Sequence, residues 1–140
     1  MEKNPTFVPV VAAVIRDPGG RLLLQRCPAH KRHAGKWEFP GGKVEDGETP
    51  RLALCREVAE ELGLELDPRA MEPAGFADEE PAEGAPPVVL FLYSCPVWRG
   101  VPQALEGQRW NWFTPAEARL LPLPEMDRTL LERWPQPPRG

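Results

Sequence analysis

The sequence contains little cysteine, and its three cysteines are widely spaced, at Cys27, Cys55 and Cys95. An odd number, separated by 28 and 40 residues, fits neither a disulfide framework nor the closely spaced ligands of a structural zinc site. We therefore expect three free thiols that have no role in a disulfide or a metal site.

Long apolar runs are absent too, because no stretch approaches the ~18–20 residues that a membrane-spanning helix needs. Residues 1–5 lack the apolar core and the cleavage site of a secretory signal. We expect a cytoplasmic protein with no membrane partner. A basic excess is also missing, since 17 lysines and arginines face 21 acidic residues, for a net charge of −4. This balance argues against duplex DNA as a partner, but it allows a phosphorylated small substrate if a bound metal supplies positive charge.

The 140 residues, 41% of them apolar, are enough for one globular core. We expect a single domain over residues 1–134 and a frayed tail over residues 135–140. Apolar or alternating runs predict five strands, at residues 7–15, 21–26, 37–39, 88–97 and 109–113. Helices are expected at residues 50–62, 115–120 and 125–134, and a long hairpin loop at residues 78–87. This order predicts an α/β or α+β fold with helices on both faces of a sheet.

The helix predicted over residues 50–62 is the most informative segment. Thr49 followed by Pro50 is typical of a helix start, and Gly63 stands where a left-handed residue ends a helix. At about 100° per residue, an apolar set forms the expected core face. This set is Leu52, Cys55, Val58, Ala59 and Leu62. Glu57, Glu60 and Glu61 fall within an arc of about 100° on the opposite side, so we expect Glu61 to face solvent.

The acidic arc has two interpretations. Like-charged contacts cost only a few tenths of a kcal/mol in water, so the arc can be an ordinary solvated surface. Clustered carboxylates also suit Mg²⁺ or Mn²⁺. The surroundings favour a metal, because Gly41-Gly42 offers bare backbone that a metal or phosphate can approach closely. Glu48, just before the helix, can pair with Arg56 and brace the turn.

Taken together, the pattern Gly42-x5-Glu48-x7-Arg56-Glu57-Val58-x-Glu60-Glu61-x-Gly63-Leu64 resembles the Nudix box, with every defining position filled. A full chance match is expected in roughly one such chain in ten million, so the resemblance is specific. Residues 22–26 (Leu-Leu-Leu-Gln-Arg) and 37–43 (Trp-Glu-Phe-Pro-Gly-Gly-Lys) are also similar to the MutT-like branch of the Nudix hydrolases.

This resemblance implies a Nudix-type α/β/α sandwich with a central mixed β-sheet and a loop–helix–loop catalytic platform. It also implies an enzyme that cleaves a nucleoside diphosphate linked to another group, with Mg²⁺ as the cofactor and Mn²⁺ as a substitute. The implied metal ligands are Glu57, Glu60, Glu61 and the main-chain carbonyl of Gly41 or Gly42. Glu48 and Arg56 are implied as structural braces, and Glu106 stands where this branch has a further carboxylate.

The residue types are consistent with phosphoanhydride hydrolysis. The negative charge of a polyphosphate repels a nucleophile, and metal ions that bridge its oxygens neutralise that charge and acidify a bound water. One carboxylate must remain able to accept the proton of the attacking water. We expect Glu57 to be this base, with Glu60 and Glu106 as the alternatives.

The MutT-like branch places the nucleotide base near the first strand, the Glu38-Phe39 segment and the start of the last helix. The substrate contacts implied by this likeness are Arg26, Glu38, Phe39 and Asp127. Phe39 or Trp110 could stack on a base, and packing in the core is the alternative for both. An ionised Asp127 would favour the two N–H donors of guanine, whereas a protonated one could also serve an oxidised adenine.

We expect Mg²⁺-dependent hydrolysis of damaged or non-standard nucleoside triphosphates, of the 8-oxo-dGTP kind, to nucleoside monophosphate and pyrophosphate. Cys27 and Arg32 depart from the arginine and histidine of the best-known enzyme of this kind, so other substrates stay open. These are CTP or 5-methyl-dCTP, triphosphorylated RNA 5′ ends, and nucleoside diphosphate sugars such as ADP-ribose. A non-catalytic Nudix-like binding domain is a further alternative, although such domains usually lose the box glutamates. A monomer and a homodimer are equally compatible with the sequence.

Overall fold

The structure is a computed structural model that describes residues 6–28, 33–80 and 82–133. Its largest sheet is mixed, with the strand order β4-β1-β7-β6. The four strands are β1 (Val8–Val14), β4 (Gly41–Lys43), β6 (Glu72–Glu79) and β7 (Val88–Ser94). Strand β7 runs parallel to β1, whereas β4 is antiparallel to β1 and β6 is antiparallel to β7. The sheet therefore ends in β4 on one side, and β4 adjoins the candidate site.

The remaining strands form two smaller antiparallel sheets. One has the order β3-β2-β9, and the other pairs β5 with β8. Their bounds are β2 (Leu22–Arg26), β3 (Trp37–Glu38), β5 (Glu65–Leu66), β8 (Trp98–Arg99) and β9 (Arg109–Phe113). Hydrogen bonding continues from the end of β1 into β2, because the amide of Leu23 donates to the carbonyl of Ile15 at 2.9 Å.

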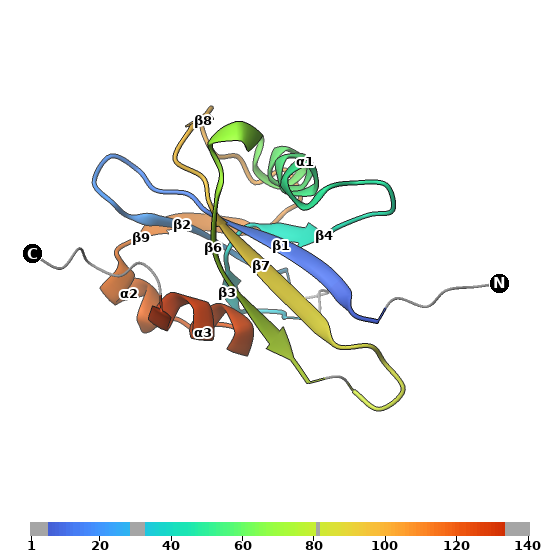
Figure 1. Cartoon of the computed structure of the whole chain (residues 1–140). Coiled ribbons are helices and arrows are strands. Elements are labelled where there is room, and N and C mark those ends of the chain that lie inside the picture. The colour runs from blue at the N-terminus through green and yellow to red at the C-terminus, as the bar shows by residue number, and fades with distance from the viewer. Residues whose placement is uncertain (1–5, 29–32, 81, 134–140) are drawn as a thin grey trace, which may run out of the picture.

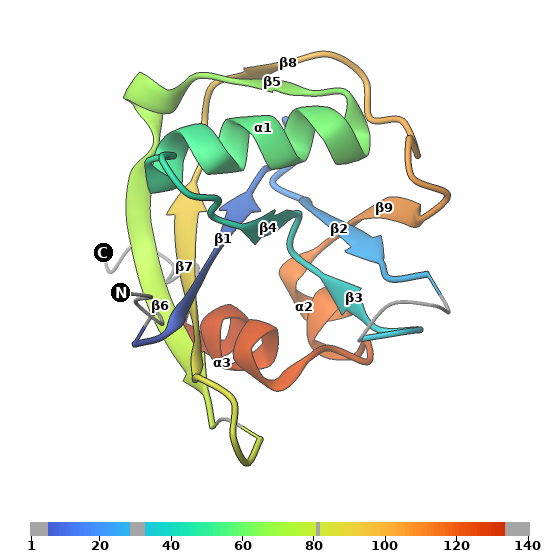
Figure 2. The same cartoon turned by 90° about the vertical axis from the view of Figure 1, so that its right-hand side faces the viewer.

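Three helices and one short 3₁₀ turn cover these sheets. They are α1 (Pro50–Leu62), the turn Pro68–Ala70, α2 (Pro115–Arg119) and α3 (Glu125–Arg133). Helix α1 lies on one side of the sheets, and α2 and α3 lie on the other (Figures 1 and 2). Within the described ranges, no helix is long and apolar enough to cross a membrane. The predicted α+β fold with a mixed central sheet between helices is confirmed.

Strand β1 divides the apolar core into two layers. Val11 and Ala13 pack on the α1 side, whereas Ala12 and Val14 pack on the α3 side. Successive side chains of a strand point to opposite faces, so a strand covered on both faces is apolar without interruption. This explains the valine-rich run in the sequence. Because β1 is packed on both faces, it is a firm partner for β4, which pairs with it and adjoins the candidate site.

Strand β6 was missing from the sequence prediction. It is an edge strand in which a single residue, Ala77, is buried, so it has neither an apolar run nor a regular alternation. The predicted hairpin loop at residues 78–87 does connect two antiparallel strands, but Asp78 and Glu79 belong to β6 rather than to the loop. The predicted tail at residues 135–140 and the inward position of Trp134 lie outside the described residues.

The ends of α1 were predicted correctly, but its core face was not. Leu52 is 55% exposed and Ala59 is also exposed, whereas Leu54 is fully buried. The residues that pack on the sheets are Ala53, Leu54, Val58 and Leu62. The helix is therefore rotated about its axis relative to the prediction. The rotation turns Glu57 and Glu61 toward β4 instead of solvent.

Candidate active site

Local sequence chemistry fixes where α1 begins and ends. The hydroxyl of Thr49 accepts a hydrogen bond from the amide of Leu52 at 3.3 Å, and Pro50 occupies the first turn. At the other end Gly63 has φ of 70°, and its amide donates to the carbonyl of Ala59 at 3.0 Å. These caps fix the residues at which the helix begins and ends, and with them the positions of its glutamates along β4.

Two glycines allow β4 to approach both β1 and α1 closely. A β-carbon on Gly41 would collide with the carbonyl oxygen of Val11, and one on Gly42 would collide with the carboxyl group of Glu57. The amide of Gly41 donates to Oε1 of Glu61 at 3.2 Å. The Gly41-Gly42 pair therefore brings bare backbone against the acidic face of the helix.

An acidic cavity of about 400 Å³ lies between α1, β4, β2 and the segment before β9. Its lining includes six carboxylates, those of Glu38, Glu45, Glu57, Glu60, Glu61 and Glu106, together with the backbone of Gly41 and Gly42. The structure thus brings together all of the residues predicted as metal ligands or as the base. Among the residues that the structure describes, Arg56 is the one arginine or lysine in this lining.

Arg56 connects the loop before α1 to the glutamates of the helix. Its Nε and Nη2 donate to the two carboxylate oxygens of Glu48 at 2.6 and 2.9 Å, and its Nη2 also donates to the carbonyl of Lys43 at 3.1 Å. Its Nη1 donates to Glu57 at 3.0 Å and to Glu60 at 3.3 Å. The hydrogen bonds from Arg56 hold the pKa of Glu48 down at about 2. The predicted pairing of Arg56 with Glu48 is therefore present.

Glu57 and Glu61 lie in a less polar environment than the sequence suggested. Burial raises the pKa of Glu61 to about 8, and the nearby carboxylates of Glu57 and Glu106 add to the rise. Burial also raises the pKa of Glu57, against the opposing effect of Arg56. The expectation that Glu61 faces solvent is wrong, because the rotation of α1 carries it under the edge of β4. Of the three arc glutamates, Glu60 is the exposed one.

The donor set of the acidic cavity suits a hard divalent cation. Carboxylate and carbonyl oxygens are the ligands that Mg²⁺ and Mn²⁺ prefer, and the carboxylates here outnumber the single arginine. Within residues 6–28, 33–80 and 82–133, no three acidic, histidine or cysteine side chains are already gathered around one metal position. Arg56 holds Glu57 and Glu60 in its own hydrogen bonds.

Two glutamines in the site were not singled out from the sequence. Gln25 on β2 and Gln108 just before β9 are 4% and 7% exposed, and Nε2 of Gln108 donates to Oε1 of Gln25 at 3.1 Å. Nε2 of Gln108 also donates to the carbonyl of Glu61 at 2.7 Å. The sequence does contain one indication of this pair. Gln25 directly follows three leucines that are expected in the core, so a polar side chain is expected at a buried position there.

A smaller hollow of about 180 Å³ adjoins the acidic cavity and shares His33, Glu38, Gly41 and Gly42 with it. Its other lining is largely apolar, and it contains both Phe39 and Asp127. Oδ2 of Asp127 accepts a hydrogen bond from the amide of Phe39 at 3.0 Å. Burial raises the pKa of Asp127 to about 8, and the neighbouring Glu38 contributes to the rise.

The other expected substrate contacts lie elsewhere. Arg26 is exposed and lines a separate hollow beside the acidic cavity, with Cys27 and Arg109 among its neighbours there. Trp110 lines neither the acidic cavity nor the smaller hollow and packs against the α1-side core, so its role is in packing. The three cysteines are free, as expected. Arg32 lies outside the described residues.

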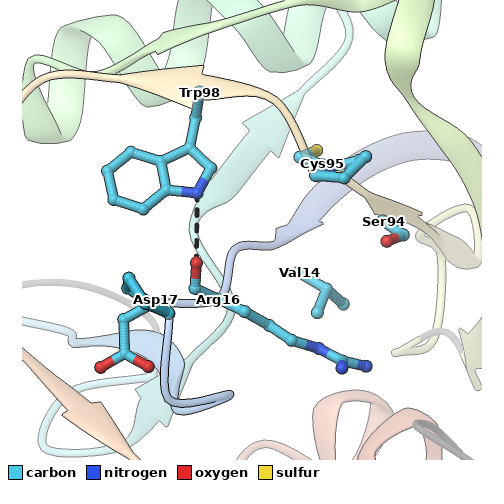
Figure 3. A pocket seen from close by; sticks show the side chains of 8 residues that line it. Val14, Arg16, Asp17, Ser94, Cys95 and Trp98 are labelled. Carbon is cyan, nitrogen blue, oxygen red and sulfur yellow. Dashed lines mark hydrogen bonds between the residues drawn. The ribbon is translucent and has the colours of Figure 1, made fainter.

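A third cavity, of about 540 Å³, lies at the C-terminal end of β1 (Figure 3). Its lining includes Arg16, Cys95 and Trp98, and the indole nitrogen of Trp98 donates to the carbonyl of Arg16 at 3.2 Å. The lining holds one carboxylate, that of Asp17, which pairs with Arg21 at 2.7 Å. This cavity therefore lacks the clustered oxygen ligands that distinguish the acidic cavity.

Comparison with known proteins places this site in a family. Residues 6–134 match the NUDIX domain. The chain is 42% identical over 128 residues, 91% of each protein, to a CTP pyrophosphohydrolase of Escherichia coli. It is 33% identical to an 8-oxo-dGTP diphosphatase of the same species, over 75% of this chain and 78% of that protein. The solution structure of the E. coli ORF135 protein superimposes with a TM-score of 0.79 at 40% identity, covering 91% of this chain and 88% of the other. The chain therefore belongs to the Nudix hydrolase family, in its MutT-like branch, and is a pyrophosphohydrolase.

Proposed function

We propose that the protein hydrolyses nucleoside triphosphates to nucleoside monophosphate and pyrophosphate with Mg²⁺ in the acidic cavity, and that cytosine nucleotides are its preferred substrates. The observation that carries the proposal is the adjacency of the two hollows, which share Glu38, Gly41 and Gly42. A nucleotide has the same two parts, a polyanionic chain that needs a cation and a flat base that needs an apolar slot. The acidic cavity would take the first and the smaller hollow the second.

A cytosine base is compatible with the environment of Asp127. Its burial and the nearby Glu38 favour the protonated carboxyl, which is a donor and an acceptor at once. Cytosine presents a matching pair, since its ring N3 accepts and its 4-amino group donates. Adenine presents such a pair at N1 and its 6-amino group, and guanine presents one at O6 and N1–H, so the carboxyl alone does not select the base. The similarity to a CTP pyrophosphohydrolase is the observation that favours cytosine. Hydrolysis of 8-oxo-dGTP is the second candidate, supported by the relatives of that name.

For the chemical step, we assign the metal to Glu57, Glu60, Glu61, Glu106 and the carbonyl of Gly41. Once bound, Mg²⁺ would neutralise the phosphate oxygens and lower the pKa of the attacking water. We assign the role of base to Glu57. Arg56 orients Glu57 through the 3.0 Å hydrogen bond, and the paired Glu48 holds Arg56 in turn.

A kinetic panel tests the substrate. We expect kcat/KM for CTP and 5-methyl-dCTP to exceed the values for unmodified dATP, dGTP and dTTP, for ADP-ribose and for triphosphorylated RNA. Asp127→Ala should reduce kcat/KM for the cytosine nucleotides by about 1–3 kcal/mol, because a buried hydrogen-bonding partner of the base is lost. Glu125→Ala, at an exposed position in the same turn of α3, is the matched control and should leave the ranking unchanged.

Each outcome of the panel has a defined meaning. If 8-oxo-dGTP ranks first, the second candidate replaces the first within the same reaction. If ADP-ribose or RNA ranks first, the substrate assignment is wrong. An equal loss for every base in Asp127→Ala would make Asp127 a structural residue of the α3 terminus.

A further inference from the structure

The segment between β8 and β9 is anchored on the last turn of α1. The amide of Gln103 donates to the carbonyl of Leu62 at 2.9 Å, and the amide of Leu105 donates to the carbonyl of Glu61 at 3.1 Å. The last carbonyls of a helix have no partner within the helix, so these bonds replace water there. The acidic helix and the segment that carries Glu106 are thus joined through main-chain atoms.

The side chain of Gln108 extends this connection into the core. Its Nε2 donates both to Oε1 of Gln25 and to the carbonyl of Glu61, at 3.1 and 2.7 Å, and its Oε1 accepts from the amide of Glu106 at 3.0 Å. Both hydrogens of this buried amide and its oxygen are therefore in use. One side chain ties β2, the end of α1 and the backbone of Glu106 together.

Gln25 completes the connection on the other side. Its side chain lies beside the carboxylate of Glu61, and that carboxylate accepts a hydrogen bond from the amide of Gly41 at 3.2 Å. Hydrogen bonds therefore lead from the backbone of Glu106 through Gln108 both to the main chain of Glu61 and to Gln25 next to its carboxylate. Glu106 itself is exposed and precedes a glycine, so without this path little would fix its position.

We propose that Gln25 and Gln108 form a glutamine clamp, a pair of positioning residues that holds Glu106 and Glu61 on opposite sides of one metal position. The proposal rests on the metal-dependent function proposed above. Both carboxylates line the acidic cavity. If the positions of these two carboxylates are fixed before the cation binds, less side-chain entropy is lost on binding, and the affinity for the cation is higher. The clamp makes no contact with the reacting phosphate and acts through the two glutamates.

The test uses direct Mn²⁺ binding to the nucleotide-free protein, measured by calorimetry. Gln108→Met keeps the size of the side chain and removes its hydrogen bonds, and we expect Mn²⁺ affinity to fall by about tenfold. The amide of Glu106 should also exchange with solvent faster, since its acceptor is gone. Gln103→Met, an exposed glutamine on the same segment, is the matched control and should change neither quantity. If Gln108→Met does not fold, Gln108→Asn keeps a polar group in the site but is too short to span the three partners.

A double-mutant cycle separates positioning from general destabilisation. In a Glu106→Gln background the clamp has lost one of the two carboxylates that it positions and still holds Glu61, so we expect Gln108→Met to lower Mn²⁺ affinity by about threefold rather than tenfold. Unchanged Mn²⁺ affinity in a folded Gln108 variant would overturn the proposal, and so would the same tenfold loss in the Glu106→Gln background. Because no nucleotide is present, these results stand apart from the substrate panel. A protein that fails to hydrolyse CTP can still show an intact clamp.

Discussion

Glu61 joins three parts of the active site through one side chain. Its carboxylate accepts from Gly41 on β4, its carbonyl accepts from Gln108, and it lines the acidic cavity. Glu61→Gln keeps an oxygen that can accept from Gly41 but removes the charge. We expect the variant to fold, to lose at least ~100-fold in turnover, and to lose the rise in melting temperature that millimolar Mg²⁺ gives the wild type.

Thermal melts with and without Mg²⁺, together with initial rates, measure both effects. Glu65→Gln is the matched control, because Glu65 is an exposed glutamate on β5 that pairs with Arg99 at 2.8 Å, outside the acidic cavity. It should behave as wild type. Near-normal turnover and metal response in Glu61→Gln would remove Glu61 from the ligand set.

Asp127 makes stability depend on pH in an unusual direction. Its folded pKa is raised to about 8 from 3.8, so between these values the folded state holds a proton that the unfolded state has released. Stability from this group is therefore fully present below about pH 3.8 and is lost as the pH rises toward 8. Asp127→Asn has no such proton. The wild type should therefore lose stability relative to Asp127→Asn as the pH rises from 5 to 8. We expect the difference between their free energies of unfolding to shift in favour of the variant by at most ~1.4 kcal/mol per pH unit. Urea denaturation of both proteins at each pH measures this, and a constant difference would mean that Asp127 titrates normally.

The contact between β4 and α1 depends on the absence of a side chain at Gly42. A methyl group there meets the carboxyl group of Glu57, whereas the main chain at this position has no unusual φ. We expect Gly42→Ala to fold with a similar melting temperature but to lose ~100-fold in kcat, because a displacement of about 1 Å at a reacting group has effects of that size. Gly19→Ala, where the new methyl meets its nearest atom at 3.5 Å, is the control and should be neutral. Full activity in Gly42→Ala would show that the position of Glu57 is not critical.

Helix α1 also shows what sequence alone can predict. Its ends followed from Thr49, Pro50 and Gly63, because capping depends on residues within a few positions of one another. The rotation of α1 about its axis could not be predicted in this way, because it depends on how closely β4 approaches the helix. That close approach is seen only in the structure, where a side chain at Gly42 would collide with Glu57. Edge strand β6 was missed for a related reason, because exposed strands carry little apolar pattern.

Long-range pairs account for the remaining gap between sequence and site. Gln25 and Gln108 are 83 positions apart, and Phe39 and Asp127 are 88 apart. In such a pair, nothing near one residue in the sequence indicates which distant residue is its partner. The box residues from Gly42 to Gly63 could be identified because one loop and one helix carry them all. The glutamine clamp and the hydrogen bond to Asp127 required the fold.

The molecule as a whole holds an acidic cavity and a smaller, largely apolar hollow side by side, and both are lined by Gly41 and Gly42 of β4. We expect this arrangement to split a nucleoside triphosphate into monophosphate and pyrophosphate only when a divalent cation is bound. Phosphorus NMR of CTP incubated with the protein follows the products directly. We predict signals of CMP and pyrophosphate in the presence of Mg²⁺ and unchanged CTP after the metal is removed with EDTA. Release of CDP and inorganic phosphate, or equal hydrolysis in EDTA, would contradict the account.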